Sequence, residues 1–196
     1  MADAVTWNTV REAARGSAAA RRDLVDRTVD DLWALAMRLT RRKDQADDVV
    51  QETYTRALAT LDGLQPTGRF EGYLARIATN VVLERWRRHR PTAAVSEGLS
   101  DDALEPWQAV ANAEDDRRRL AAVWSAVGEL EPKPRAAVLL FYAHGESCEG
   151  IGRILDVPAG TVKTWLHRSR NQIRQRAEAL LDGQPAAGGA RTGDLT

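Results

Sequence analysis

The sequence predicts an all-α protein built from two small helical domains that a flexible acidic linker joins. Apolar residues recur at helical spacing along most of the 196 residues, no segment shows a convincing strand-like alternation, and Gly and Pro lie mostly between the helical segments. The length fits one or two domains, and 43% hydrophobic with 29% charged residues is typical of a folded soluble protein.

The first half of the chain contains three predicted helices. One is expected over residues 24–39 and a second over residues 47–61, because each segment places apolar side chains three or four positions apart. Turn-forming residues at 62–68 then precede a third helix, which begins at Phe70, runs into a cluster of arginines and stops at Pro91.

These helices form the expected N-terminal domain, residues 1–90. Residues 91–113 combine Pro, Ser and Gly with acidic residues and are predicted to be the linker. The C-terminal domain is expected over residues 114–182, and residues 183–196, rich in Gly and Ala, are predicted to be a disordered tail. Within the C-terminal domain, helices are predicted around residues 114–129, 134–143, 147–155 and 159–181.

Charge is distributed unevenly along the chain. Lys and Arg total 28 and balance 28 Asp and Glu, which argues against a general nucleic-acid binder and against an acidic disordered chain. Residues 1–90 and 132–196 each carry a surplus of three positive charges, whereas residues 91–131 carry six more acids than bases. Of the basic residues 25 are Arg, whose forked guanidinium suits phosphates and base edges.

Residues 147–170 show the pattern of a helix-turn-helix, in which a tight turn joins a short helix to a longer one. On the longer helix, small or apolar side chains share one face: Val162, Leu166, Ser169, Ile173 and Ala177. The opposite face carries Lys163, Thr164, His167, Asn171 and Arg174. Residues 161–177 hold five basic residues and no acidic one, so this face suits a DNA major groove; a solvated basic surface is the alternative.

The same segment resembles the fourth conserved region of bacterial sigma factors, especially the small extracytoplasmic-function (ECF) group. The resemblance is carried by Leu130, Pro134-Arg135, Val138-Leu139-Leu140, Ile151 to Leu155, Val157-Pro158-Ala159-Gly160-Thr161-Val162-Lys163-Thr164 and Leu166-His167-Arg168-Ser169-Arg170. It implies that four side chains read the minus-thirty-five promoter element, namely Lys163, Thr164, His167 and Arg168. It also implies that Arg170 and Arg174 contact phosphates.

The N-terminal domain resembles the second conserved region of the same family. Asp47-Asp48-Val49-Val50-Gln51-Glu52 is similar to the segment that docks on the clamp helices of core RNA polymerase. Asp48, Gln51 and Glu52 lie at positions i, i+3 and i+4, so we expect one acidic polar patch that helps to bind the polymerase. An ordinary solvated helix face is the alternative.

Residues 70–80 resemble the promoter-melting segment of the family. A stripe with an aromatic ring, an amide and cations suits exposed bases and phosphates, and consists of Tyr73, Arg76, Asn80 and Arg87. With Arg88, and with Leu64 of a loop that would cap a pocket for a flipped base, these residues are expected to engage and open the minus-ten element. Core packing is an open alternative for Tyr73 and the favoured expectation for Trp86.

Several positions depart from the family pattern. Gly150 stands where the family often has Glu, so Ser147 lacks the partner of a capping box, and Gly152 replaces a usual Ala. Glycine costs about 0.5–1 kcal/mol of helix propensity, so the first helix of the helix-turn-helix is expected to be locally weak unless a partner stabilises it. Trp165 stands beside the DNA face, where the family commonly has Arg.

The residues and the resemblance together predict an ECF sigma factor, not an enzyme, that directs promoter-specific transcription initiation. The expected partners are core RNA polymerase, at its clamp helices and flap, promoter DNA and an anti-sigma protein. No cofactor is expected, and the free chain is expected to be a monomer. A cytoplasmic location is expected because Cys148 is the lone cysteine and neither a signal peptide nor an apolar run of membrane-spanning length is visible.

Other functions stay open at this stage. A repressor or activator would bind DNA through the helix-turn-helix alone, which leaves the acidic patch and the Tyr73–Asn80 stripe without a purpose. A sigma mimic that binds only an anti-sigma protein need not keep a basic recognition helix. Cys148 and His144 are four residues apart and could form half of a metal site.

Overall fold

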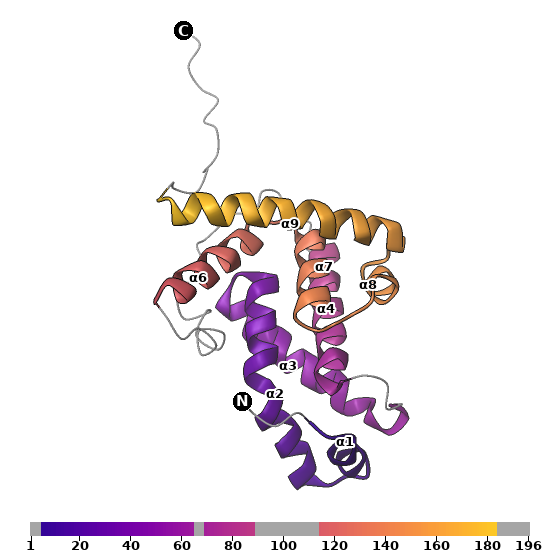
Figure 1. Ribbon diagram of the computed structural model, residues 1–196. Coiled ribbons are helices and arrows are strands. Elements are labelled where there is room, and N and C mark those ends of the chain that lie inside the picture. The colour runs from indigo at the N-terminus through magenta and orange to yellow at the C-terminus, as the bar shows by residue number, and fades with distance from the viewer. Residues whose placement is uncertain (1–4, 65–68, 89–113, 184–196) are drawn as a thin grey trace.

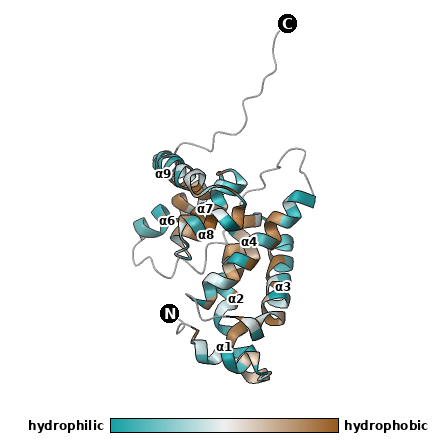
Figure 2. Ribbon diagram, turned by 90° about the vertical axis from the view of Figure 1, so that its right-hand side faces the viewer, coloured by the Kyte–Doolittle hydropathy of each residue, from teal (hydrophilic) through white to brown (hydrophobic). Residues whose placement is uncertain are grey.

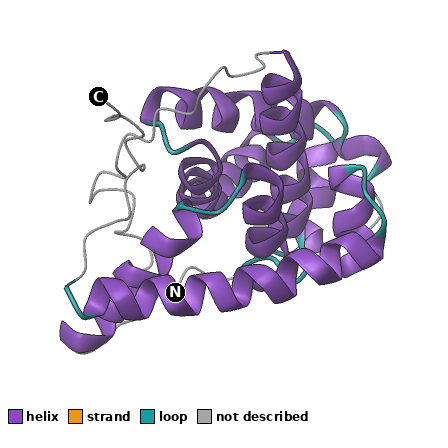
Figure 3. Ribbon diagram, turned by 90° about the horizontal axis from the view of Figure 1, so that it is seen from above, coloured by secondary structure: helices purple, strands orange, loops and turns teal. Residues whose placement is uncertain are grey.

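The computed structural model describes residues 5–64, 69–88 and 114–183, and these segments fold almost entirely into helices (Figure 1). The described segments contain no strand, which confirms the prediction of an all-α fold (Figure 3). The predicted linker at 91–113 and residues 184–196 of the predicted tail lie outside the described residues.

The N-terminal domain contains the three predicted helices: α2 (Ala18–Thr40), α3 (Lys43–Ala59) and α4 (Phe70–Arg88). A 3₁₀ turn, η1 (Leu61–Gly63), follows α3. In this domain α2 packs on both α3 and α4, and α3 packs on α4.

A further helix, α1 (Trp7–Ala14), was not predicted from the sequence. It buries only Val10 and Ala13, which is too short an apolar stripe for periodicity to reveal. Its signals are caps: the Thr6 side chain accepts a hydrogen bond from the backbone N–H of Thr9 at 3.3 Å, and Gly16 follows the helix with φ 94°.

The C-terminal domain contains α6 (Glu114–Gly128), α7 (Pro132–Tyr142), α8 (Cys148–Leu155) and α9 (Ala159–Leu181). The boundaries lie within two residues of the predicted ones. The long helix α9 crosses above α6, α7 and α8; α1, α2 and α3 lie mainly below these helices, whereas α4 runs up beside α7 (Figure 1).

The two domains share one connected set of buried side chains. Leu24 and Leu74 of the N-terminal domain belong to the same cluster as Leu140, Ile151 and Leu166 of the C-terminal domain. Helix α4 contacts α7 and α8, and α2 contacts α7. Hydrophobic segments of α4, α7 and α8 accordingly lie close together in Figure 2. The structure therefore holds the two domains against each other.

Among the described residues, no helix combines the length and the apolar character needed to cross a bilayer.

Candidate nucleic-acid and polymerase interfaces

Helix α9 separates its two faces as the sequence predicts. All six side chains expected to meet the minus-thirty-five element are exposed: Lys163, Thr164, His167, Arg168, Arg170 and Arg174. On the opposite face, Val162, Leu166 and Ser169 are buried, with 5% exposure or less. The buried stripe fixes the rotation of the helix about its axis, so the basic face points to solvent.

Three contacts organise the exposed face of α9. The Nε of Arg170 donates to the hydroxyl oxygen of Tyr142 at 3.1 Å, and Nη2 of Arg174 donates to Asn171 Oδ1 at 2.8 Å. The hydroxyl of Thr164 donates to a backbone carbonyl one helical turn earlier at 3.0 Å. Tyr142 is 56% exposed, so this ring at the end of α7 extends the basic surface. Trp165 is half-buried and packs against the core beside that surface.

The turn between α8 and α9 requires a close approach of two backbone segments. A Cβ added to Gly152 would lie 2.7 Å from the carbonyl oxygen of Val157, so a larger residue would push the turn away from α8. The chain turns at Asp156, which has a left-handed φ of 55°. Its N–H and that of Val157 both bond to the Gly152 carbonyl. Gly152 thus allows the tight turn that brings α9 onto α8.

The expected polymerase-docking patch on α3 is part of a network of ion pairs between acidic and basic side chains. Asp48 Oδ2 lies 3.3 Å and Glu52 Oε2 lies 3.1 Å from the guanidinium of Arg85 on α4. Glu52 also lies 2.5 Å from Arg56, which forms two hydrogen bonds to Glu84 at 2.7 and 2.9 Å. Hydrogen bonds from Arg85 and then Arg56 hold the pKa of Glu52 below its usual range.

The availability of the three predicted docking residues therefore differs. Gln51 is exposed, and the Asp48 side chain is 64% exposed, whereas Glu52 is half-buried with both carboxylate oxygens bonded to arginines. A partner would meet Asp48 and Gln51 directly and Glu52 as part of an existing ion-pair network.

The predicted minus-ten stripe on α4 has members in different surroundings. Asn80 and Arg87 are exposed, and Arg88 is exposed with its guanidinium 3.3 Å from Glu84. Tyr73 is half-buried: its ring centroid lies 5.8 Å from that of Phe70, and its hydroxyl lies 2.6 Å from the Thr60 hydroxyl. Tyr73 thus packs on the core while its polar end reaches the surface. Arg76 contacts the C-terminal domain, as developed below.

Trp86 is half-buried and packs against the core, in agreement with the favoured expectation for this residue. It follows that the exposed polar residues of α4, rather than this indole, face any partner at the end of the helix.

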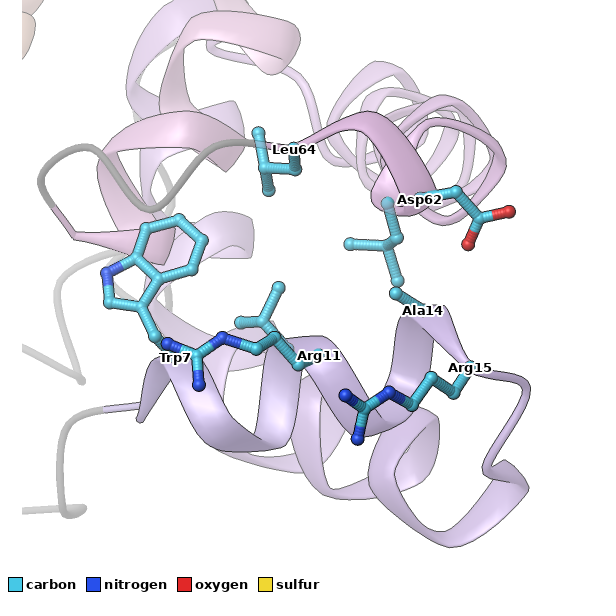
Figure 4. A pocket seen from close by; sticks show the side chains of 8 residues that line it. Trp7, Arg11, Ala14, Arg15, Asp62 and Leu64 are labelled. Atoms are coloured by element: carbon cyan, nitrogen blue, oxygen red, sulfur yellow. The ribbon is translucent and has the colours of Figure 1, made fainter.

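Leu64 lines a cavity of about 260 Å³ between η1 and α1 (Figure 4). Trp7 and Arg11 of α1, Arg15 directly after it and Asp62 of η1 also line the cavity. In Figure 4 the Leu64 side chain faces the cavity opposite Trp7 and Arg11. The sequence did not suggest this grouping, because α1 itself was not predicted. If α1 had been predicted, the spacing of Arg11 and Arg15, one helical turn apart, would have indicated a basic surface beside it.

Within the described segments, no three His, Cys, Asp or Glu side chains are grouped so that they could hold a metal ion. His144 is half-buried, and burial, reinforced by the positive charge of Arg69, lowers its pKa to about 4. A neutral imidazole is therefore held in the contact between the domains.

Comparison with known proteins matches each domain to a conserved region of one protein family. Residues 24–92 match the family model for sigma-70 region 2, and residues 120–173 match that for sigma-70 region 4. The ECF RNA polymerase sigma factor SigW of Bacillus subtilis is 30% identical over 183 residues, which cover 87% of this chain and 96% of the relative. The chain belongs to the ECF sigma factors.

Other ECF sigma factors are similarly related. SigL of Mycobacterium tuberculosis is 33% identical over 175 residues, covering 87% of this sigma factor and 96% of the relative. Among solved structures, CnrH in complex with the cytosolic domain of CnrY is 25% identical, with a TM-score of 0.56 over 91% of this chain and 97% of that one. RpoE of Bartonella quintana, crystallised with the anti-sigma factor NepR, shares the fold at 22% identity and a TM-score of 0.56.

The sigma factor therefore directs RNA polymerase in promoter-specific transcription initiation, and it does so as a non-enzymatic subunit. The prediction of an ECF sigma factor is confirmed. A stand-alone regulator would need only the helix-turn-helix, whereas the match extends over region 2 as well as region 4.

Proposed function

We propose that α9 reads the minus-thirty-five element of the promoter. Lys163, Thr164, His167 and Arg168 meet base edges in the major groove, while Arg170 and Arg174 contact phosphates. The observation that carries this proposal is the continuous exposed basic face of α9, set opposite a buried stripe. Tyr142 supports Arg170 from the side.

The minus-ten element is engaged and opened by the outward side of α4 and the adjoining loop. The residues assigned to this step are Leu64, Tyr73, Arg76, Asn80, Arg87 and Arg88. The exposure of Asn80 and Arg87 supports the assignment, as does the cavity next to Leu64, where Arg11 and Arg15 add positive charge for a displaced strand.

Core RNA polymerase binds both domains: Asp48, Gln51 and Glu52 dock on the clamp helices, and the region 4 domain docks on the flap. Exposed Asp48 and Gln51 support the first contact. An anti-sigma protein is a further partner, as the complexes of CnrH with CnrY and of RpoE with NepR suggest. The free sigma factor is a cytoplasmic monomer in this proposal and needs no cofactor.

Run-off transcription with purified core polymerase tests the assignment of function. The template is a library of upstream regions, and the expected result is a set of transcripts that requires the sigma factor and shares two upstream elements. The absence of any sigma-dependent transcript would refute it.

The docking patch is tested by Asp48→Arg, which places a cation where a basic partner surface is expected. Like charges at an interface cost several kcal/mol, so affinity for core polymerase should fall at least about tenfold. Asp26→Arg, at an exposed site on α2, makes the same charge reversal and should leave core affinity unchanged. Equal affinity of both variants would locate the docking patch elsewhere.

The recognition face is tested by Lys163→Ala and Arg168→Ala in promoter binding by the holoenzyme. Loss of a base contact costs about 1–3 kcal/mol and relaxes the preference for one upstream position. Arg176→Gln removes one charge from the same helix, but Arg176 is bonded to Glu129 and serves as the control. Unchanged affinity in both test variants would place the recognition face on another surface.

A further inference from the structure

One ion pair joins the predicted minus-ten surface to the C-terminal domain. Nε of Arg76, on α4, donates to Oε1 of Glu146 at 2.5 Å. Glu146 lies in the loop between α7 and α8, and its side chain is only 8% exposed although it is an acid. Its backbone N–H bonds to the carbonyl of Leu140 at 3.0 Å, which fixes the loop on the end of α7.

Gly150 makes room for this contact, and Gly72 lies on its other side. A Cβ on Gly150 would lie 2.6 Å from Oε2 of Glu146, so the carboxylate occupies the space that a side chain at this position would fill. On the other side, a Cβ on Gly72 would lie 3.9 Å from both Oε1 of Glu146 and the carbonyl oxygen of His144. The loop therefore lies directly over the first turns of α4.

Other contacts hold the domains in this position. Nη2 of Arg135 on α7 donates to the carbonyl of Leu39 at 3.0 Å, and Nη1 of Arg41 donates to the carbonyl of Gly128 at 2.9 Å. The guanidinium of Arg38 stacks 4.0 Å from the ring centroid of Trp124. These contacts lie between the end of α2 and the start of the C-terminal domain, whereas the Glu146 loop, together with α7 and α8, lies against α4.

We propose that the Glu146 carboxylate is an autoinhibitory competitor for Arg76 of the minus-ten surface in the free sigma factor. The carboxylate of Glu146 takes the place on Arg76 that a DNA phosphate would take, since both are anions that accept hydrogen bonds from a guanidinium. Its negative charge also repels a DNA strand that approaches α4. The Arg76 side chain is 44% exposed, but its guanidinium must release Glu146 before it can bind a phosphate of the promoter in that place. This inference rests on the proposed minus-ten role of Arg76.

The helical defect at Gly150 has a reason under this proposal. The glycine weakens α8 but gives the Glu146 carboxylate its position, and Ser147 still caps the helix by accepting the Gly150 N–H at 3.0 Å. Gly150→Ala keeps every charge and strengthens the helix, and its Cβ requires Oε2 of Glu146 to shift, so we expect it to weaken the contact of this carboxylate with Arg76.

The test compares three full-length variants: Glu146→Gln, Gly150→Ala and the control Glu149→Gln. The control removes one negative charge from an exposed site on α8, close to Glu146 in the sequence. The first readout is fluorescence anisotropy of a labelled single-stranded DNA pool of random sequence, about 12 nucleotides long, bound by the free sigma factor. The second is amide hydrogen exchange of residues 70–80 and 143–149. A partly exposed ion pair corresponds to an affinity gain of about two- to fivefold.

Glu146→Gln and Gly150→Ala should each bind the oligonucleotide about two- to fivefold more tightly than Glu149→Gln does. Both variants should also show faster amide hydrogen exchange in residues 70–80 and 143–149. The gain should vanish when Arg76→Ala is added. Equal affinity of Glu146→Gln and Glu149→Gln would overturn the proposal, even if exchange changes, and so would a gain that persists without Arg76. Run-off transcription separates the two claims, because a wild-type chain without sigma-dependent transcripts refutes the proposed function, independently of the oligonucleotide result.

Discussion

The half-buried imidazole of His144 predicts a loss of stability in mild acid. Burial and, to a smaller extent, the positive charges of Arg69 and Arg38 together lower its pKa from 6.5 to about 4, although Glu71 partly opposes them. Between pH 6.5 and 4, the unfolded chain binds a proton that the folded chain does not. The free energy of unfolding therefore falls as the pH falls through this window, and the effect is absent above pH 6.5.

The magnitude follows from the size of the pKa change. A displacement of 2.5 between 6.5 and about 4 corresponds to about 3 kcal/mol at the acidic end of the window. At pH 5 the difference in proton binding amounts to about 2 kcal/mol. Urea unfolding at pH 7.5 and pH 5 measures this difference for the wild type and for His144→Gln, which keeps a polar side chain but cannot titrate.

The comparison between variants isolates this residue. Carboxylates with lowered pKa values, such as Glu52 and Glu84, titrate in both proteins and cancel in the difference. The reasoning fails if His144→Gln loses as much stability between pH 7.5 and pH 5 as the wild type does.

Further variants address other contacts. Arg135→Ala removes buried hydrogen bonds to carbonyls at the ends of α2 and α6 and should lower the free energy of unfolding by about 2 kcal/mol or more in urea; an unchanged midpoint would contradict this. Tyr142→Phe removes the acceptor for Arg170 and should weaken binding of the holoenzyme to the minus-thirty-five element by about 0.5–1.5 kcal/mol without a change in thermal stability. Gly152→Ala should destabilise the chain by about 1–3 kcal/mol in thermal unfolding despite its better helix propensity, because its Cβ meets the carbonyl of the following turn; a rise in Tm would refute that packing argument.

The fold was predictable where helices bury long apolar stripes. Helices α2 to α4 and α6 to α9 each place several apolar side chains on one face, so periodicity predicts that they exist, although α2 and α3 begin at Ala18 and Lys43 rather than at the predicted 24 and 47. Helix α1 buries only Val10 and Ala13, so periodicity did not predict it. The contact between the domains was not predicted either, because it depends on tertiary packing that no local pattern encodes.

The candidate site was predictable to the extent that it lies on one helix. The exposed face of α9 follows from the angular position of each residue around a single axis. By contrast, the partners of Glu52 include Arg85, which lies on another helix, and the partner of Arg76 is Glu146, 70 positions later in the chain. In the sequence, Gly150 only weakens a predicted helix. The carboxylate of Glu146, which fills the space beside this glycine, becomes apparent only in the structure.

The two kinds of contact between the domains differ in how they tolerate mutation. Arg41 and Arg135 donate to main-chain carbonyls of Gly128 and Leu39, and every amino acid supplies such a carbonyl. Substitutions at those acceptor positions leave the acceptor atom in place, so only the arginine side is constrained. The contact between Arg76 and Glu146 needs both side chains. Sequence drift would thus preserve the packing of the two domains, whereas a single substitution at Arg76 or Glu146 would remove the ion pair that joins them.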